Sequence, residues 1–104
     1  MAQFSEEVRD GQSVVRVAGD LDLAAVEDFV QVVESCLGRS EGVELDLAGV
    51  SFIDSSGLGA LVRSRKAAEA QSKTLRLSNV NEPTQRLLNL TGLAEVFDIR
   101  TSLD

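Results

Sequence analysis

The stretch from Val43 to Ala68 changes its hydrophobic period once, and that change constrains the fold more than any other feature. Apolar and acidic residues alternate at its start, in the order Val43, Glu44, Leu45, Asp46 and Leu47. This period of two predicts a half-buried strand. After Gly59 the apolar spacing approaches 3.6 residues, which predicts a helix from about Ser56 to Gln71. A strand that leads through a tight turn into a helix is a unit of α/β domains.

The remaining segments also indicate strands and helices separated by turns. Asp10-Gly11 is a favoured hairpin turn, so residues 4–18 are expected to form an antiparallel hairpin, although residues 3–9 hold few large apolar groups. The other predicted elements are a turn at 19–22, a helix from the N-cap Asp22 to Gly38, a strand at 74–78, a helix begun by Asn81-Glu82-Pro83 and ended by Gly92, and a strand at 96–99. Residues 100–104 are expected to fray.

The predicted elements follow one another in the order β-β-α-β-α-β-α-β. Strands separated by helices of this length are expected to be parallel neighbours joined by right-handed crossovers. The predicted fold class is therefore α/β. We expect a single compact domain over residues 1–104, with a mixed, mostly parallel sheet of about four to five strands packed with α-helices.

Composition excludes several classes of function. The chain has no histidine, which removes the usual general base, the Ser-His-Asp arrangement and most transition-metal sites. Its one cysteine, Cys36, has no partner for an internal disulfide and is expected to be a small buried hydrophobe. The net charge of −7 argues against binding to nucleic acid or to an anionic membrane. We expect no enzyme activity, no metal and no cofactor.

The N-terminal residues and the apolar runs bear on location. The first seven residues are acidic and lack the basic and apolar regions of a secretion signal. No apolar run approaches the length that spans a membrane. A cytoplasmic location is the expectation.

Asp54, Ser55 and Ser56 supply short polar side chains where the predicted helix begins, and such side chains cap helix N-termini. Two hydroxyl groups at the positive end of a helix dipole could also bind an anion or accept a phosphate. Capping alone explains such serines about equally well. Because no catalytic partner is available, a serine here suits the role of a kinase substrate better than that of a nucleophile.

Two other site hypotheses are weaker. Gly57-Leu58-Gly59 belongs to neither of the common glycine-rich nucleotide motifs, so nucleotide binding at the helix N-terminus is a minor alternative. Asp20, Asp22, Asp46 and Asp54 could gather at one edge of a parallel sheet as an acidic metal pocket. The spacing instead favours Asp22 and Asp54 as caps and Asp46 in solvent, since no lysine follows a later strand to complete a phosphoryl site.

The stretch Phe52-Ile53-Asp54-Ser55-Ser56-Gly57-Leu58-Gly59 resembles the signature of bacterial anti-sigma-factor antagonists, the stand-alone STAS domains. Two further stretches agree in order and separation, Val17-Ala18-Gly19-Asp20-Leu21-Asp22 and Arg86-Leu87-Leu88-Asn89-Leu90-Thr91-Gly92-Leu93. The resemblance covers essentially the whole chain and implies a STAS-like fold.

The resemblance also implies a partner-switching mechanism in transcription regulation. In that family the unphosphorylated antagonist binds an ATP-binding anti-sigma factor of the GHKL type, which is also a serine kinase, and so frees the sigma factor. The kinase phosphorylates the serine directly after the aspartate, and the complex dissociates until a PP2C-type phosphatase restores it. That serine corresponds to Ser55, with Ser56 as second choice, and the supporting aspartate of the family corresponds to Asp22.

By the same resemblance, Asp54 is expected to support the phosphorylation site together with Asp22. The implied partner-binding residues are Asp20, Asp22, Ser55, Ser56, Gly57 and Leu58. The alternative function is a STAS interaction module that does not switch, such as a scaffold or a transporter-associated subunit. The residues by themselves do not separate Ser55 from Ser56, and they identify neither the sigma factor nor the oligomeric state.

Overall fold

The computed structural model describes residues 2–100, which form one five-stranded sheet and three α-helices in the predicted order. The strands are β1 (Gln3–Arg9), β2 (Gln12–Leu21), β3 (Gly42–Ile53), β4 (Thr74–Ser78) and β5 (Asp98–Arg100). The helices are α1 (Val26–Leu37), α2 (Ser55–Ala70) and α3 (Glu82–Thr91), with short 3₁₀ turns η1 (Leu23–Ala25) and η2 (Leu93–Glu95). The predicted α/β fold class is confirmed.

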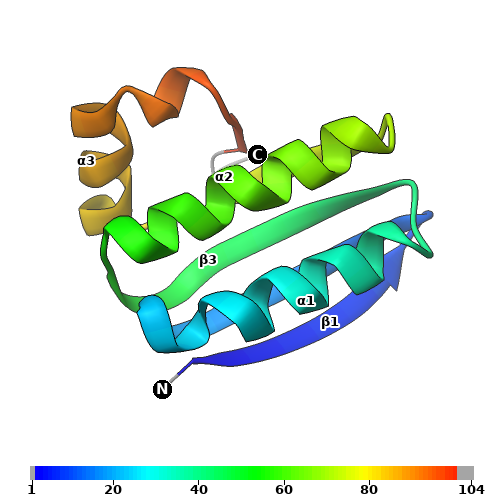
Figure 1. Ribbon diagram of the computed structural model, residues 1–104, viewed down its shortest axis with the longest axis horizontal. Helices are drawn as coiled ribbons and strands as arrows, with labels where there is room; N and C mark the ends of the chain where they lie inside the picture. Colours follow the sequence, from blue (N-terminus) through cyan, green and yellow to red (C-terminus); the bar gives the residue numbers. More distant parts are fainter. Residues whose placement is uncertain (1, 101–104) are drawn as a thin grey trace.

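The strands lie in the sheet in sequence order, β1-β2-β3-β4-β5. β1 and β2 pair antiparallel through a tight turn in which Asp10 and Gly11 both have positive φ, which confirms the predicted hairpin. β2 to β5 are all parallel. Right-handed crossovers that always move one place in the same direction put their helices on one face of the sheet. α1 and α2 accordingly lie side by side over β3 (Figure 1).

The two faces of the sheet carry different residues. Strand residues that face α1 and α2 are fully buried, among them Val15, Leu45 and Leu77. The residues between them point to the other face and are mostly charged. There Arg16 donates a hydrogen bond to Glu7, and its Nε lies 3.7 Å from Oδ2 of Asp46. The sheet therefore has its core on one face, as the alternating pattern predicted.

The prediction of a turn at residues 19–22 is wrong, because β2 continues to Leu21. Its pairing with β3 contains two register shifts, one of which follows Gly19. Gly19 has a φ of +88°, so the glycine that suggested a turn accommodates an irregularity within the strand. β3 is also longer than predicted and runs without a break to Ile53. The tight turn before α2 is thus reduced to Asp54.

Smaller boundaries also differ. α2 begins at Ser55 rather than at about Ser56, and the last strand is Asp98–Arg100 rather than residues 96–99. β1 is a complete strand in spite of its few apolar groups, because every residue pairs with β2. Of the residues expected to fray, Arg100 belongs to β5 and 101–104 lie outside the described residues.

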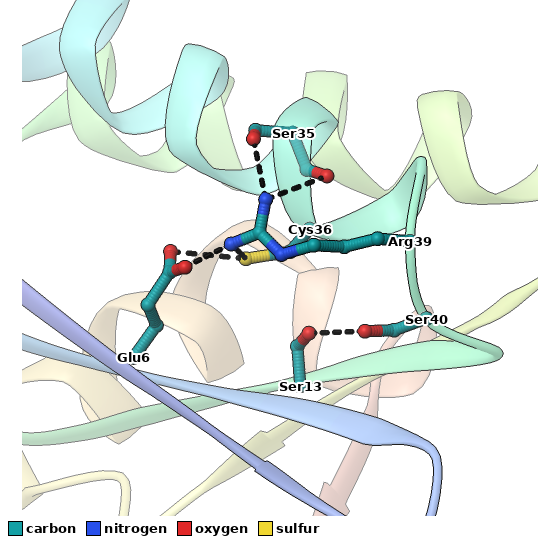
Figure 2. Close-up of polar contacts among 6 residues, drawn as sticks. All are labelled: Glu6, Ser13, Ser35, Cys36, Arg39 and Ser40. Atoms are coloured by element: carbon teal, nitrogen blue, oxygen red, sulfur yellow. Dashed lines mark hydrogen bonds and ion pairs between the residues drawn. The ribbon is translucent and has the colours of Figure 1, made fainter.

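A polar cluster joins the C-terminal end of α1 to the β1–β2 hairpin (Figure 2). Arg39 donates to the Ser35 hydroxyl at 2.7 Å and pairs with the Glu6 carboxylate. The Cys36 thiol donates to the same carboxylate at 3.3 Å. Burial, and secondarily the Glu6 carboxylate, raises the pKa of that thiol. Cys36 is fully buried, which confirms the expectation of a small core residue.

Candidate functional site

Two parallel strands end side by side at the edge where the candidate serines lie. Leu21 of β2 pairs with Ile53 of β3, and an aspartate follows each of them. Asp22 and Asp54 have nearly the same backbone conformation, with φ and ψ of −121° and −172° and of −122° and −168°. Each is followed by a helical turn. The structure thus brings Asp22 and the Asp54-Ser55-Ser56 segment together, as predicted.

Asp54 is the N-cap of α2, which confirms that part of the prediction. Its Oδ1 accepts hydrogen bonds from the backbone N–H of Ser56 at 2.9 Å and of Gly57 at 3.1 Å. These bonds satisfy two of the four N–H groups that a helix start leaves without a partner. They also fix the direction in which Ser55, the first residue of α2, leaves the turn.

Asp22 does not cap α1, so its predicted capping role is wrong. The 3₁₀ turn η1 separates Asp22 from α1, and Ala25 occupies the position before the helix. The Asp22 side chain makes no capping hydrogen bond to η1 either. Asp22 is half-buried and follows the end of β2, next to the end of β3, without capping a helix.

Ser55 and Ser56 differ in exposure. The Ser55 side chain is exposed, whereas Ser56 is half-buried. Within the described part of the chain, the Ser55 hydroxyl has no hydrogen-bond partner. A group that approaches from solvent therefore reaches Ser55 more easily, and this geometry separates two residues that the sequence left equivalent.

Gly57 and Leu58, two of the implied partner-binding residues, are buried. Leu58 belongs to the hydrophobic core. A Cβ atom on Gly57 would overlap the backbone carbonyl oxygen of Leu21 and lie 2.8 Å from Cγ1 of Ile53. Gly57 thus allows the first turn of α2 to pack directly against the end of β2. Both residues therefore pack within the fold next to Ser55.

The surface around Ser55 is acidic. Residues 17–38 and 40–62, which include the ends of β2 and β3, η1 and the start of α2, contain no lysine and no arginine. Asp20, Asp22 and Asp54 lie at the strand ends themselves. Such a surface repels anions and attracts cationic groups over a range of about 8–10 Å at physiological salt.

The acidic residues do not form a metal pocket. Within residues 2–100, no three side chains of the His, Cys, Asp and Glu types are grouped in a way that could hold a metal ion. The prediction that Asp46 points into solvent is wrong. Only 15% of its side chain is exposed, and it lies against Arg16. Its Oδ1 accepts a hydrogen bond from the Ala48 N–H.

Two exposed apolar side chains at the strand ends near the serines were not predicted from the sequence. Leu23 is the first residue of η1 and is 75% exposed, and Phe52, near the end of β3, is 52% exposed. Phe52 lies beside Asp20 in the register of β2 and β3. Leu23 lies three residues before Val26 and seven before Val30, in phase with the apolar stripe of α1, so the sequence carried no signal of its exposure. Leu23 belongs to the 3₁₀ turn η1 and not to α1.

A family model for the STAS domain matches residues 3–104. An anti-sigma-B factor antagonist of Staphylococcus epidermidis is 36% identical over 88 residues, which cover 82% of this chain and 80% of that protein. These two findings confirm the resemblance that the motifs indicated.

Solved structures agree with this result. The crystal structure of an anti-sigma factor antagonist from Mycobacterium paratuberculosis superposes with a TM-score of 0.85 at 25% identity, covering 95% of this chain and 85% of that one. The Bacillus cell fate determinant SpoIIAA in its phosphorylated form superposes with a TM-score of 0.73 at 25% identity, covering 96% and 93%. Among residues 2–100, no helix is both long enough and apolar enough to cross a membrane.

Proposed function

The chain belongs to the STAS domain family, and from that premise we propose that it is an anti-sigma-factor antagonist that works by partner switching. The unphosphorylated chain binds an anti-sigma factor that is also an ATP-binding serine kinase, and the sigma factor is released. Phosphorylation of Ser55 ends that binding, and a PP2C-type phosphatase restores it. The chain acts as a substrate and a binding partner in the cytoplasm, and catalysis belongs to the kinase and the phosphatase.

The exposed hydroxyl of Ser55, at the first residue of α2, is the observation that carries this proposal. A kinase must bring the serine oxygen in line with the γ-phosphate of ATP, which requires an accessible side chain at a fixed position. The Asp54 cap fixes the backbone on the C-terminal side of Ser55. Asp22 lies on the neighbouring strand end, where its carboxylate can orient the hydroxyl or the kinase groups that approach it.

The energetics of such a switch follow from charge. A phosphate adds about −1.5 to −2 charges and three acceptor oxygens. The dipole of α2 tolerates a phosphate at its N-terminus, so the fold need not change. Because the cap already uses the N–H groups of Ser56 and Gly57, these two donors do not neutralise the new anion. If an unneutralised phosphate costs about 3 to 4 kcal/mol in the complex, binding weakens several-hundred-fold.

Labelling with ATP and the serine kinase tests the site. The wild-type chain and the Ser56→Ala variant should each accept one phosphate, whereas Ser55→Ala should accept none. Mass spectrometry of the intact chain and of its peptides gives the count and the position. Incorporation into Ser55→Ala at the wild-type rate would reject Ser55 as the site.

Removal of the phosphate tests the return step. A PP2C-type phosphatase should release the phosphate from Ser55 and restore binding to the anti-sigma factor. If the phosphorylated and unphosphorylated chains bind equally, the chain is a STAS interaction module that does not switch, and the proposal is wrong.

A further inference from the structure

Two large apolar side chains, Leu23 and Phe52, are exposed at the strand ends that lead to Ser55. Leu23 is the first residue of η1, which follows the end of β2 at Leu21. Ser55 is the first residue of α2, which follows the end of β3 at Ile53, and Leu21 and Ile53 pair with each other. Phe52 comes three residues before Ser55. Isolated apolar residues on a surface are common, but these two lie at the end of the sheet where the proposed switch operates.

We propose that Leu23 and Phe52 are the apolar anchors through which the anti-sigma factor/serine kinase docks on this surface. The inference rests on the proposed function and extends it to the chemistry of the partner. Aromatic and aliphatic side chains that enter pockets at the centre of an interface supply most of its binding energy. The partner surface then presents apolar pockets for Leu23 and Phe52 near the Ser55 position.

The charge around the anchors identifies the rim of that partner surface. Asp20 pairs with Phe52, and Asp22 precedes Leu23. Asp54 follows the end of β3, while the segments 17–38 and 40–62 contain no basic residue. A partner with lysine or arginine around its apolar pockets complements this pattern. A second copy of the same chain would instead bring acidic surface against acidic surface, which disfavours self-association through this face.

The anchors also explain how a phosphate can weaken binding to a partner with a basic rim. With Leu23 and Phe52 buried, Ser55 lies in the water-excluded centre of the interface rather than at its rim. A phosphate there loses its hydration, and a charge that is buried without a partner is strongly unfavourable. The basic rim increases the rate of association, while the dry centre makes the complex sensitive to phosphorylation.

The experiment measures the affinity and the association rate of the kinase for four forms of the full chain: wild type, Leu23→Ala, Phe52→Ala and the control Val8→Ala. Val8 is an exposed apolar residue of β1, 64% exposed, and pairs with Ser13 at the far end of the sheet. Each anchor variant should bind about tenfold more weakly, and Val8→Ala should bind like wild type. Thermal unfolding of all four forms shows whether the truncations leave the fold intact.

A salt series separates the roles of the rim and the centre. Between about 0.05 and 0.5 M salt, the association rate of the wild-type chain should fall steeply. The ratio of the affinities of wild type and Ser55→Asp should change much less. An equally steep fall of that ratio would mean that the charge on residue 55 acts at an exposed rim, which overturns the assignment of a dry centre.

Other outcomes overturn the docking proposal without affecting the proposed function. Wild-type affinity in both anchor variants, with binding still lost in Ser55→Asp, would show that the anchors lie outside the interface. A wild-type dimer in sedimentation experiments that Leu23→Ala converts to monomer would make a second copy the occupant. If the wild-type chain neither binds the kinase nor accepts a phosphate at Ser55, the proposed function itself fails.

Discussion

Gly57 and Gly59 lie two residues apart in α2, and the structure predicts opposite effects when each is replaced by alanine. A methyl group at Gly57 would overlap the Leu21 carbonyl oxygen and crowd Ile53, both of which belong to the packed strand ends. A methyl group at Gly59 would meet no atom within 4 Å. Gly57→Ala should therefore destabilise the fold, and Gly59→Ala should stabilise it.

The magnitudes follow from helix propensity and packing. Alanine is favoured over glycine within a helix by about 0.5–1 kcal/mol, which is the expected gain for Gly59→Ala. Overpacking costs about 1–3 kcal/mol or more when backbone must move, so Gly57→Ala should lose about 1–2 kcal/mol after the propensity gain is subtracted. The two variants should thus differ by about 1.5–3 kcal/mol, or roughly 7–14 °C in Tm for a domain of this size.

Urea and thermal unfolding of the two variants and the wild type give this difference directly. The same preparations can be phosphorylated by the kinase, and the rate at Ser55 should fall for Gly57→Ala and change little for Gly59→Ala. If Gly57→Ala is as stable as the wild type, α2 does not pack on β2 as described. If Gly59→Ala is the less stable variant, the conclusion that Gly57 is closely packed and Gly59 faces open space is wrong.

Three further predictions concern stability and reactivity. Asp54→Ala should lower the free energy of unfolding by about 1 kcal/mol in a urea titration because the α2 cap is lost, while Asp54→Asn should retain most of it; equal losses would contradict the capping role. A hydrogen bond from Arg9, and secondarily one from Arg16, lowers the pKa of Glu7. The stabilisation from these ion pairs is therefore present at neutral pH and is lost as the pH falls below the usual glutamate pKa of about 4.3. Glu7→Gln should therefore be less sensitive to acid between about pH 5 and 3 than wild type, and parallel curves would refute this. The buried thiol of Cys36, with its raised pKa, should resist alkylation at neutral pH in the native chain and react at once in denaturant; rapid native labelling would contradict its burial.

The fold was predictable because local signals and overall pattern agree over most of the chain. The alternation at residues 43–47 predicted a strand with one buried face, and β3 has that face. Asp10-Gly11 predicted the hairpin turn, and Asn81 and Gly92 predicted the two ends of α3. Each of these signals depends on a few neighbouring residues, which is why the sequence was sufficient.

Errors arose where pairing between distant strands decided the structure. Gly19 indicates a turn when it is considered alone, but its pairing with β3 makes it part of a strand. Asp22 is a residue type that commonly caps helices, but the 3₁₀ turn η1 separates it from α1. Neither outcome can be read from local sequence, because each depends on how β2 and β3 align.

The candidate site was predicted in part. The sequence located Asp54 and the two serines at a helix start, and the family resemblance favoured Ser55. The exposure of Ser55 and the partial burial of Ser56 add a physical difference between them. The family signature also suggested Gly57 and Leu58 as partner-binding residues, and the structure adds that Gly57 packs against Leu21 and that Leu58 belongs to the core. Exposure is a property of the folded surface, so the sequence alone did not show that Leu23 and Phe52 are exposed.

The most direct test of partner switching is the affinity of the anti-sigma factor for this chain in its two phosphorylation states. Isothermal titration calorimetry with the unphosphorylated chain, and with the chain phosphorylated stoichiometrically at Ser55, gives both dissociation constants under the same conditions. The proposed function predicts that phosphorylation weakens binding several-hundred-fold while the thermal unfolding of the chain changes little. Dissociation constants that agree within about threefold, less than 1 kcal/mol, would contradict it.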